Sequence, residues 1–130
     1  MLNQGRRNLK HSTEEKIWAI VAHLGFLAGG LGYVLGPILA LLIKKDSEFV
    51  KHHAKQALVW QLGTVVFLAI AGLVGFFFSA ATVGFGLLLV VPALTILALA
   101  VLVPSVIATV KVLNDEQYLY PITGLYGEKL

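Results

Sequence analysis

The sequence contains no cysteine, which excludes disulfide bonds, thiolate metal sites and cysteine nucleophiles. Charge is also scarce: Asp, Glu, Lys and Arg make up 13% of the 130 residues, against about 25% in soluble domains. Hydrophobic residues make up 58% of the chain. Because so few charges cannot cover a water-facing surface, the composition predicts an integral membrane protein with the lipid bilayer as its first partner.

The charges are missing from two long blocks of the chain. No Asp, Glu, Lys or Arg occurs in residues 17–43 or in residues 57–110. A helix that spans a membrane needs roughly 20 apolar residues. The second block therefore holds two crossings, and the first holds one long crossing or two short ones.

The first block is interrupted by a dense group of glycines and a proline, which predicts a break. We expect one helix at residues 14–28, capped by Thr13, and a second at residues 36–45. The motifs Gly-x-x-x-Gly at 25–29 and 32–36 also fit close packing of membrane helices. The residues expected to break or pack this hairpin are Gly25, Gly29, Gly32, Gly36 and Pro37.

Two longer helices follow, at about residues 49–79 and 87–113, with a turn at 82–86 between them. Pro92 and Pro104 are predicted to bend the last helix. The expected fold is an all-α integral membrane four-helix bundle whose first two helices form a short hairpin broken at Gly29–Pro37. We divide the chain into a flexible cytoplasmic tail (1–12), a membrane helical domain (13–116) and a C-terminal juxtamembrane tail (117–130).

Long basic and aromatic side chains flank the apolar blocks, where they are typical of the membrane interface. Lys51 and Lys55 are one helical turn apart and can extend to the headgroups, and Trp60 follows one further turn along. The tyrosines of the last segment fit an interfacial belt. The expected anchors are Lys44, Lys45, Lys51, Lys55, Trp60, Tyr118 and Tyr120.

The densest polar cluster is the segment Lys-His-His-Ala-Lys-Gln at residues 51–56. Adjacent histidines point about 100° apart on a helix, so His52 and His53 cannot chelate one ion together. The favoured interpretation is an interfacial helix. The alternative is a functional polar face made by His52 and Gln56, which lie one turn apart, with Gln61 as a further candidate.

His23 lies inside the first apolar block, and an ionisable group at membrane depth is a candidate functional site. The favoured interpretation is a neutral imidazole that is hydrogen-bonded to another helix. We therefore expect His23 to be neutral at pH 7 and to contact a second helix, because burial disfavours the charged form.

Enzymatic signals are weak. Neither apolar block contains an acidic residue, there is no phosphate-binding loop, and Ser79 and Ser105 lack a nucleophile-elbow context. We expect no enzymatic activity, no cofactor and no metal site. The modest net charge of +3 is spread beside apolar segments, so we expect no nucleic-acid partner.

Two segments carry a resemblance to a known family. The first is residues 36–61, with Gly-Pro-Ile-Leu at its start and Lys-His-His-Ala-Lys-Gln-Ala-Leu at 51–58, and the second is Asn-Asp-Glu-Gln-Tyr-Leu-Tyr-Pro-Ile at 114–122; His23-Leu24 matches too. The chain resembles a widespread family of small bacterial membrane proteins of unknown function. That family is distantly related to the twenty-kilodalton membrane subunit of the chloroplast inner-envelope protein-import translocon.

The resemblance implies a four-helix membrane fold and supplies no activity. The chain departs from the family pattern at Val59-Trp60, where Asn-Phe is common, and at Asp115, which replaces a turn glycine. The first departure removes a polar contact from the face that contains Gln56.

Our leading hypothesis is a non-enzymatic scaffold or interaction subunit of a bacterial inner membrane, in a translocation-like assembly if the remote relation to protein import holds. The first alternative is a small oligomeric transporter or channel, with His23 and the glycine break lining a path. The second is a membrane enzyme that uses His52 or His53. The expected partners are other membrane proteins or further copies of the chain.

The basic residues favour one membrane topology. If residues 17–43 crossed the membrane once, the Lys and Arg residues would be divided almost evenly between the two sides. If the glycine break turns the chain back, all 10 fall on one side. Only the second arrangement satisfies the positive-inside rule, so we expect a multi-pass protein with both termini in the cytoplasm.

Overall fold

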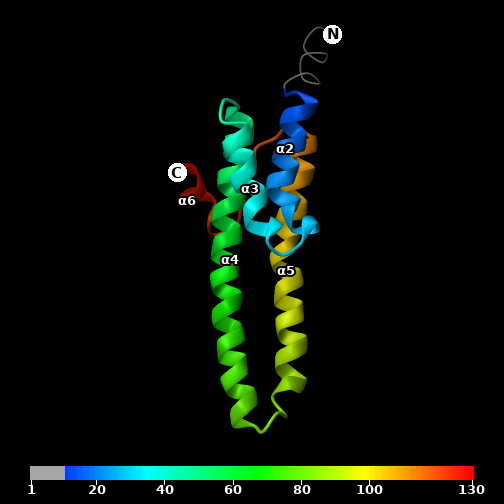
Figure 1. Ribbon diagram of the computed structural model, residues 1–130, viewed down its shortest axis with the longest axis vertical. Helices are drawn as coiled ribbons and strands as arrows, with labels where there is room; N and C mark the ends of the chain where they lie inside the picture. Colours follow the sequence, from blue (N-terminus) through cyan, green and yellow to red (C-terminus); the bar gives the residue numbers. More distant parts are fainter. Residues whose placement is uncertain (1–10) are drawn as a thin grey trace.

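A computed structural model describes residues 11–130 of the chain and confirms the all-helical prediction. The elements are α2 (Thr13–Leu24), the 3-10 helix η1 (Gly25–Ala28), α3 (Gly32–Ile43), α4 (Glu48–Ala81), α5 (Leu87–Leu113) and α6 (Gly124–Lys129). The long helices α4 and α5 run side by side along the whole molecule, whereas α2 and α3 cover only its upper part (Figure 1).

The molecule therefore has two parts. The head comprises residues 11–64 and 101–130, and the stalk comprises residues 65–100, in which α4 and α5 have no other helix beside them (Figure 1). The lower limit of the head is marked by Tyr33, near the start of α3, whose hydroxyl lies 2.7 Å from Thr64 Oγ1 on α4. The core of the head contains many small side chains, which allow α2, α3 and α4 to pack closely: Ala22, Ala40, Val50, Ala54 and Ala57.

Only α4 and α5, with 34 and 27 residues, are long and apolar enough to cross a membrane among the described residues. At 1.5 Å per residue, the 12 residues of α2 or of α3 extend only about 18 Å, which is shorter than a hydrocarbon core of about 30 Å. The predicted short first hairpin is therefore present, whereas a bundle in which four helices pack along their whole length is not what the structure shows. Instead, a shallow hairpin packs against one end of a long one.

The top of the head is fixed by reciprocal capping. Ser12, and not Thr13 as predicted, caps α2: its hydroxyl accepts from Glu15 N at 3.1 Å, and Glu15 Oε2 accepts from Ser12 N at 2.8 Å. Ser47 caps α4 in the same way by accepting from Val50 N, and its hydroxyl donates to Glu15 Oε1 at 2.6 Å. Glu15 therefore joins the start of α2 to the start of α4.

The glycines of the first hairpin serve two different purposes. A Cβ on Gly25 would overlap the carbonyl oxygen of Gly32, and a Cβ on Gly36 would lie 2.6 Å from the carbonyl oxygen of Val21. Gly25, Gly32 and Gly36 are thus at the crossing of α2 and α3, where the backbones touch. The turn itself is made by Gly29, whose φ of +111° is open to glycine.

The predicted break was too long. It was placed at Gly29–Pro37, but α3 begins at Gly32 and contains Pro37, so the break covers only residues 29–31. The close packing of Gly32 and Gly36 on α2 offsets their low helix propensity, and membrane helices tolerate an internal proline. By contrast, α5 has the bounds that the sequence predicted, including Pro92 and Pro104 within it.

The C-terminal segment, residues 114–130, is called the strap because it folds back over α4 and α5. It ends in α6, which packs against α4. Tyr120 is only 2% exposed and its ring stacks on Trp60 at 5.2 Å between centroids. The two residues predicted as membrane-interface anchors, Tyr120 and Trp60, thus bury each other's rings within the head.

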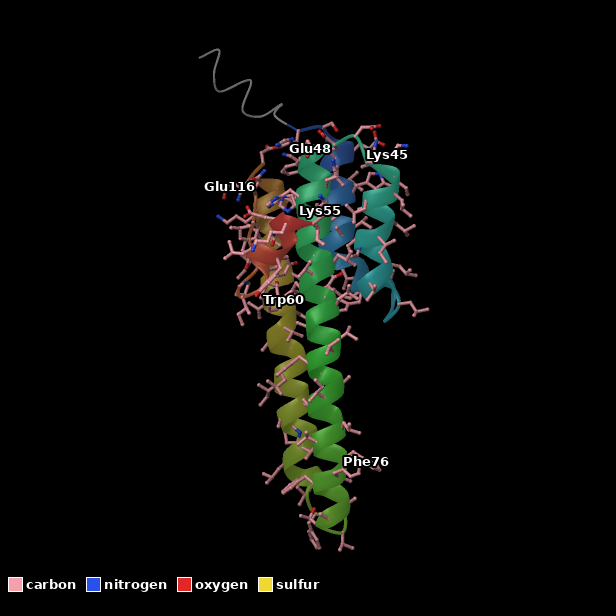
Figure 2. The ribbon with its side chains drawn as sticks, turned by 90° about the vertical axis from the view of Figure 1, so that its left-hand side faces the viewer. Lys45, Glu48, Lys55, Trp60, Phe76 and Glu116 are labelled. Atoms are coloured by element: carbon pink, nitrogen blue, oxygen red, sulfur yellow. The ribbon has the colours of Figure 1, made fainter. Side chains whose placement is uncertain are left out.

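Charge and hydrophobicity are separated along the long axis. Figure 2 shows Lys45, Glu48, Lys55 and Glu116 in the head and Phe76 far down the stalk. None of the described Lys residues falls within residues 65–100, and the stalk presents apolar side chains outward, Phe76 being 65% exposed. The predicted tail charges Arg6, Arg7 and Lys10 lie outside the described residues.

Candidate functional site

A chain of hydrogen bonds crosses the interior of the head and joins four segments. His53 Nε2 on α4 lies 3.0 Å from the carbonyl oxygen of Glu116, and His53 Nδ1 lies 2.9 Å from His23 Nε2 on α2. His23 Nδ1 lies 2.8 Å from the Tyr120 hydroxyl, which lies 3.3 Å from Ser105 Oγ on α5. The side chains of His23, His53 and Ser105 are fully buried.

The direction of this chain follows from its outer end. The Glu116 carbonyl can only accept, so His53 Nε2 carries a proton and, in a neutral ring, His53 Nδ1 does not. His23 Nε2 must then donate to His53 Nδ1, which leaves His23 Nδ1 to accept from Tyr120. The phenol has one proton, so while Tyr120 donates to His23 the remaining contact needs Ser105 as its donor; this is the reverse of the direction in the structure, where Tyr120 Oη donates to Ser105 Oγ at 3.3 Å. With both histidines neutral, every donor points from Ser105 toward Glu116.

The Tyr120 hydroxyl is suited to the middle of this chain because it stays protonated. Burial raises the pKa of Tyr120 well above its usual value, so the hydroxyl remains protonated and can donate. Burial also raises the pKa of Tyr118, to a smaller degree. Tyr118 packs edge-on against Tyr120 at 5.1 Å between centroids.

A second set of polar contacts attaches the strap to α4. His52 Nε2 donates to the carbonyl oxygen of Tyr118 at 3.1 Å. Gln56 donates from Nε2 to the carbonyl oxygen of Gly124 at 2.6 Å and accepts at Oε1 from Tyr120 N at 3.2 Å. The face shared by His52 and Gln56, identified from their spacing, is thus covered by the strap.

Gln61 lies deeper on α4 and is fully buried. Its Nε2 donates to the carbonyl oxygen of Ala22 at 3.1 Å, while its Oε1 has no partner among the described residues. Gln61 therefore ties α4 to α2 below the histidine pair. All five polar candidates, His23, His52, His53, Gln56 and Gln61, lie in the head and contact another segment.

Two hollows flank this network. A crevice of about 310 Å³ is lined mainly by apolar groups where the strap crosses between α4 and α5, and its walls include Trp60, Val101 and Ile122. A second hollow of about 540 Å³ lies at the top of the head among polar side chains that include His11, Glu48 and Glu116. Within residues 11–130, no group of three or more His, Asp or Glu side chains is arranged to hold a metal ion.

The surface charges of the head are largely paired. Lys16 Nζ lies 3.0 Å from Asp115 Oδ2, Lys111 Nζ lies 2.6 Å from Glu116 Oε2, and Lys44 pairs with Glu14. The first two pairs fix the beginning of the strap to α2 and α5. The interface anchors predicted among the lysines thus include residues with ionic partners within the protein.

The structure brings His23 and His53 together, and it adds two residues that sequence reasoning missed as site members, Tyr120 and Ser105. The expected contact between His23 and a second helix is present. Tyr120 could have been found from the family resemblance, which includes the Tyr-Pro pair at residues 120–121. Ser105, one of three hydroxyl residues in the apolar helix α5 and the neighbour of Pro104, gave no indication of its partner.

Comparison with known proteins adds the family. The model of the magnetosome magnetite crystal formation protein family matches residues 14–126, from the first turn of α2 into α6. No curated protein and no solved structure matches the chain. The matched family is a small bacterial membrane family, as the resemblance implied, but its description speaks of crystal formation and gives no relation to protein import. The chain belongs to the magnetosome magnetite crystal formation protein family.

Proposed function

We propose that this protein is a non-enzymatic component of a magnetosome membrane that acts as a scaffold or interaction subunit during magnetite crystal formation. The observation that carries the proposal is the family match, which includes the head, the stalk and most of the strap. A match of this extent supports a shared function for the whole molecule and not for an isolated motif.

The arrangement of polar groups supports a structural role. His23, His53, Tyr120 and Ser105 hydrogen-bond to one another, and Gln56 bonds the backbone of the strap. Groups used in this way hold the segments of the head in one geometry. The stalk, whose exposed side chains are apolar, is suited to lipid or to apolar helices of neighbouring membrane proteins.

We further propose that α4 and α5 cross the membrane and that the α2–α3 hairpin lies in the leaflet on the side of the head. The start of α2, the α3–α4 connection and the strap are at one end of the molecule (Figure 1). That end contains every described Lys, which supports a cytoplasmic position for it under the positive-inside rule. The turn at residues 82–86 would then face the opposite side, where a crystal grows.

The test is replacement of the family genes in a magnetite-forming bacterium. A strain that lacks its own family members would receive the native chain, the empty vector, or a Ser79→Ala variant that leaves the head intact. We expect the native chain and Ser79→Ala to change crystal size or shape, measured by electron microscopy, relative to the empty vector. Equal crystal dimensions in all three strains, with the protein present in the magnetosome fraction, would refute the proposal.

Experiments can distinguish the other two candidate functions, a translocation-like assembly and a small oligomeric channel, from this proposal. A role in a translocation-like assembly predicts a stoichiometric translocon partner after purification in mild detergent. A small oligomeric channel predicts ion flux in liposomes, although residues 57–110 contain no Asp, Glu, Lys or Arg that could line a charged path. Neither result is expected of a scaffold for crystal formation.

A further inference from the structure

The His23–His53 pair has a property that the scaffold role does not use. Two imidazoles face each other through single ring nitrogens, with 2.9 Å between His23 Nε2 and His53 Nδ1. This contact can hold only one proton, which must belong to one ring or the other. Each of the next two contacts, to Tyr120 and from there to Ser105, likewise joins groups that can both give and receive a proton.

We propose that His23 and His53 together form a buried binding site for one excess proton, and that uptake of this proton reverses the direction of the hydrogen-bond chain as far as Ser105. In the neutral chain the donors point from Ser105 to Glu116. In the protonated chain His53 donates from both nitrogens, His23 accepts at Nε2 and donates from Nδ1 to Tyr120, and Tyr120 donates to Ser105. All four contacts are kept in both states.

The proton balance of this reversal is complete. One proton passes from Ser105 Oγ to Tyr120 Oη, one from Tyr120 Oη to His23 Nδ1, and one from His23 Nε2 to His53 Nδ1. The proton that replaces the one leaving Ser105 comes from water, and because Ser105 is fully buried its uptake requires a transient opening of the head. No bond between heavy atoms forms or breaks, and the product contains one positive charge, on His53.

The site is limited to one proton by its geometry. If both rings were doubly protonated, His23 Nε2 and His53 Nδ1 would present N–H groups to each other across 2.9 Å, with no acceptor between them. The contact would then have to open. We therefore expect the first proton to leave the head intact and the second to break the pair.

Several charged or titratable groups surround the pair from every packed segment, and they decide how readily the proton is held. His52 lies next to His53, with 5.4 Å between ring centroids, and Phe49 separates His53 from His11, on which it stacks at 3.7 Å. The carboxylates of the strap, Asp115 and Glu116, are paired with Lys16 and Lys111. On the strap, the Tyr120 hydroxyl lies 2.8 Å from His23 Nδ1, and Tyr118 packs edge-on against Tyr120. Glu48 on α4 lines the hollow that also contains His11 and Phe49, and the Tyr33 hydroxyl on α3 bonds Thr64.

The test is nitrogen NMR of the full chain in lipid bicelles with ¹⁵N-labelled histidine, recorded as the pH is lowered. The signals separate a proton on Nδ1 from one on Nε2. We expect both histidines to carry their proton on Nε2 in the neutral form. On acidification, His53 gains a second proton and His23 transfers its proton to Nδ1, with one shared midpoint. A His23 that keeps its Nε2 proton while His53 titrates, or separate midpoints for the two rings, would overturn the proposal.

Ser105 provides a second, independent test. In the neutral chain Ser105 donates to the Tyr120 oxygen, which can do without that hydrogen bond. In the protonated chain Ser105 accepts from the buried Tyr120 hydroxyl, which has no other acceptor among residues 11–130. Ser105→Ala should therefore lower the shared midpoint by about 0.5–1 pH unit, since a neutral hydrogen bond contributes about 1 kcal/mol. Ser105→Thr, which keeps the hydroxyl, should restore the native midpoint.

Ser79→Ala is the matched control, because Ser79 is a buried serine whose hydroxyl has no partner among the described residues and lies outside the chain of bonds. It should leave the midpoint unchanged. If Ser105→Ala and Ser79→Ala both have the native midpoint, the reversal does not reach Ser105 and the proposal fails. The tautomer measurement on the native chain decides the matter even if Ser105→Ala does not fold.

Discussion

Gln56 holds the strap with both ends of its amide: Nε2 donates to the Gly124 carbonyl oxygen at 2.6 Å, and Oε1 accepts from Tyr120 N at 3.2 Å. A glutamine fits this position because it offers one donor and one acceptor to two backbone groups of opposite kind. Gly127 packs directly on the amide, and a Cβ there would lie 2.8 Å from Gln56 Nε2. The strap is therefore specified by Gln56 and by the absence of a side chain at Gly127.

Gln56→Ala should destabilise the strap, because it leaves one buried carbonyl and one buried N–H without a partner. Each unsatisfied group costs about 1–3 kcal/mol, so we expect the two together to lower the free energy of unfolding by about 2–6 kcal/mol. Thermal unfolding in mild detergent and the rate of proteolysis within residues 114–130 measure the effect.

His52→Ala is the comparison for that variant. It removes one hydrogen bond, to the Tyr118 carbonyl oxygen, from a half-buried position, so we expect a smaller loss of about 1 kcal/mol. Unchanged melting and unchanged proteolysis in the double variant His52→Ala/Gln56→Ala would show that the strap is held by other contacts.

The crossing of α2 and α3 gives a sharper steric prediction. Gly25→Ala would drive its methyl group into the backbone of Gly32, whereas Gly30→Ala meets nothing within 4 Å. We expect Gly25→Ala to cost about 1–3 kcal/mol or more, because neither backbone can move without opening the hairpin. Gly30→Ala, in the turn of the same hairpin, should change the melting temperature little. Equal effects of the two variants would mean that the helices are further apart than described.

Glu15 predicts a dependence of stability on pH. Hydrogen bonds from the Ser47 hydroxyl and from the Ser12 backbone lower the pKa of Glu15 below its usual value of 4.5. A lowered folded-state pKa stabilises the protein above the unfolded-state value, and this contribution is lost as the pH falls through the folded-state value. The stability difference between the native chain and Glu15→Gln should therefore be largest at neutral pH and shrink on acidification below about 4.5.

Ser47→Ala tests whether the hydrogen bond from Ser47 causes that pH dependence. It removes the largest contribution to the lowered pKa of Glu15 while the carboxylate stays in place. Chemical unfolding in detergent at several pH values should show a weaker pH dependence for Ser47→Ala than for the native chain. A difference between native and Glu15→Gln that does not vary with pH would exclude the capping carboxylate as its source.

The sequence predicted helix α5 and the turn at Gly29, because both depend on residues that are close together in the chain. Helix α5 is a continuous apolar run bounded by Gly86 and Asn114, and both bounds were found from the sequence. The turn at Gly29 was also found, since glycine is one of the few residues suited to its φ.

The position of the strap could not be predicted in this way. Tyr120 looks like an interfacial tyrosine until its partners are known, and those partners are 97 residues away at His23 and 15 residues away at Ser105. The same holds for α3, which starts at Gly32 because its glycines pack on α2. Helix propensity alone predicts a later start for this helix, because glycine is a poor helix former. The candidate site depends on such long-range contacts, so the sequence named His23 and His53 separately and not as a pair.

The last prediction concerns the side of the membrane on which the head lies. The native chain has no cysteine, so single cysteines can be placed at Asn3, which lies outside the described residues, at Ser47 in the α3–α4 connection, and at Gln117 in the strap. Because Ser47 bonds Glu15 and the strap bonds α4, the head positions share one side of the membrane, and the positive-inside rule predicts that this side is the cytoplasm. All three cysteines should be shielded from an impermeant maleimide in intact cells.

Phe85→Cys, at an exposed position in the turn between α4 and α5, should react if those helices span the membrane. Labelling of Asn3→Cys from outside while Ser47→Cys stays shielded would restore a single crossing by residues 17–43, and a shielded Phe85→Cys in cells where permeabilisation exposes it would show that the stalk does not reach the far side.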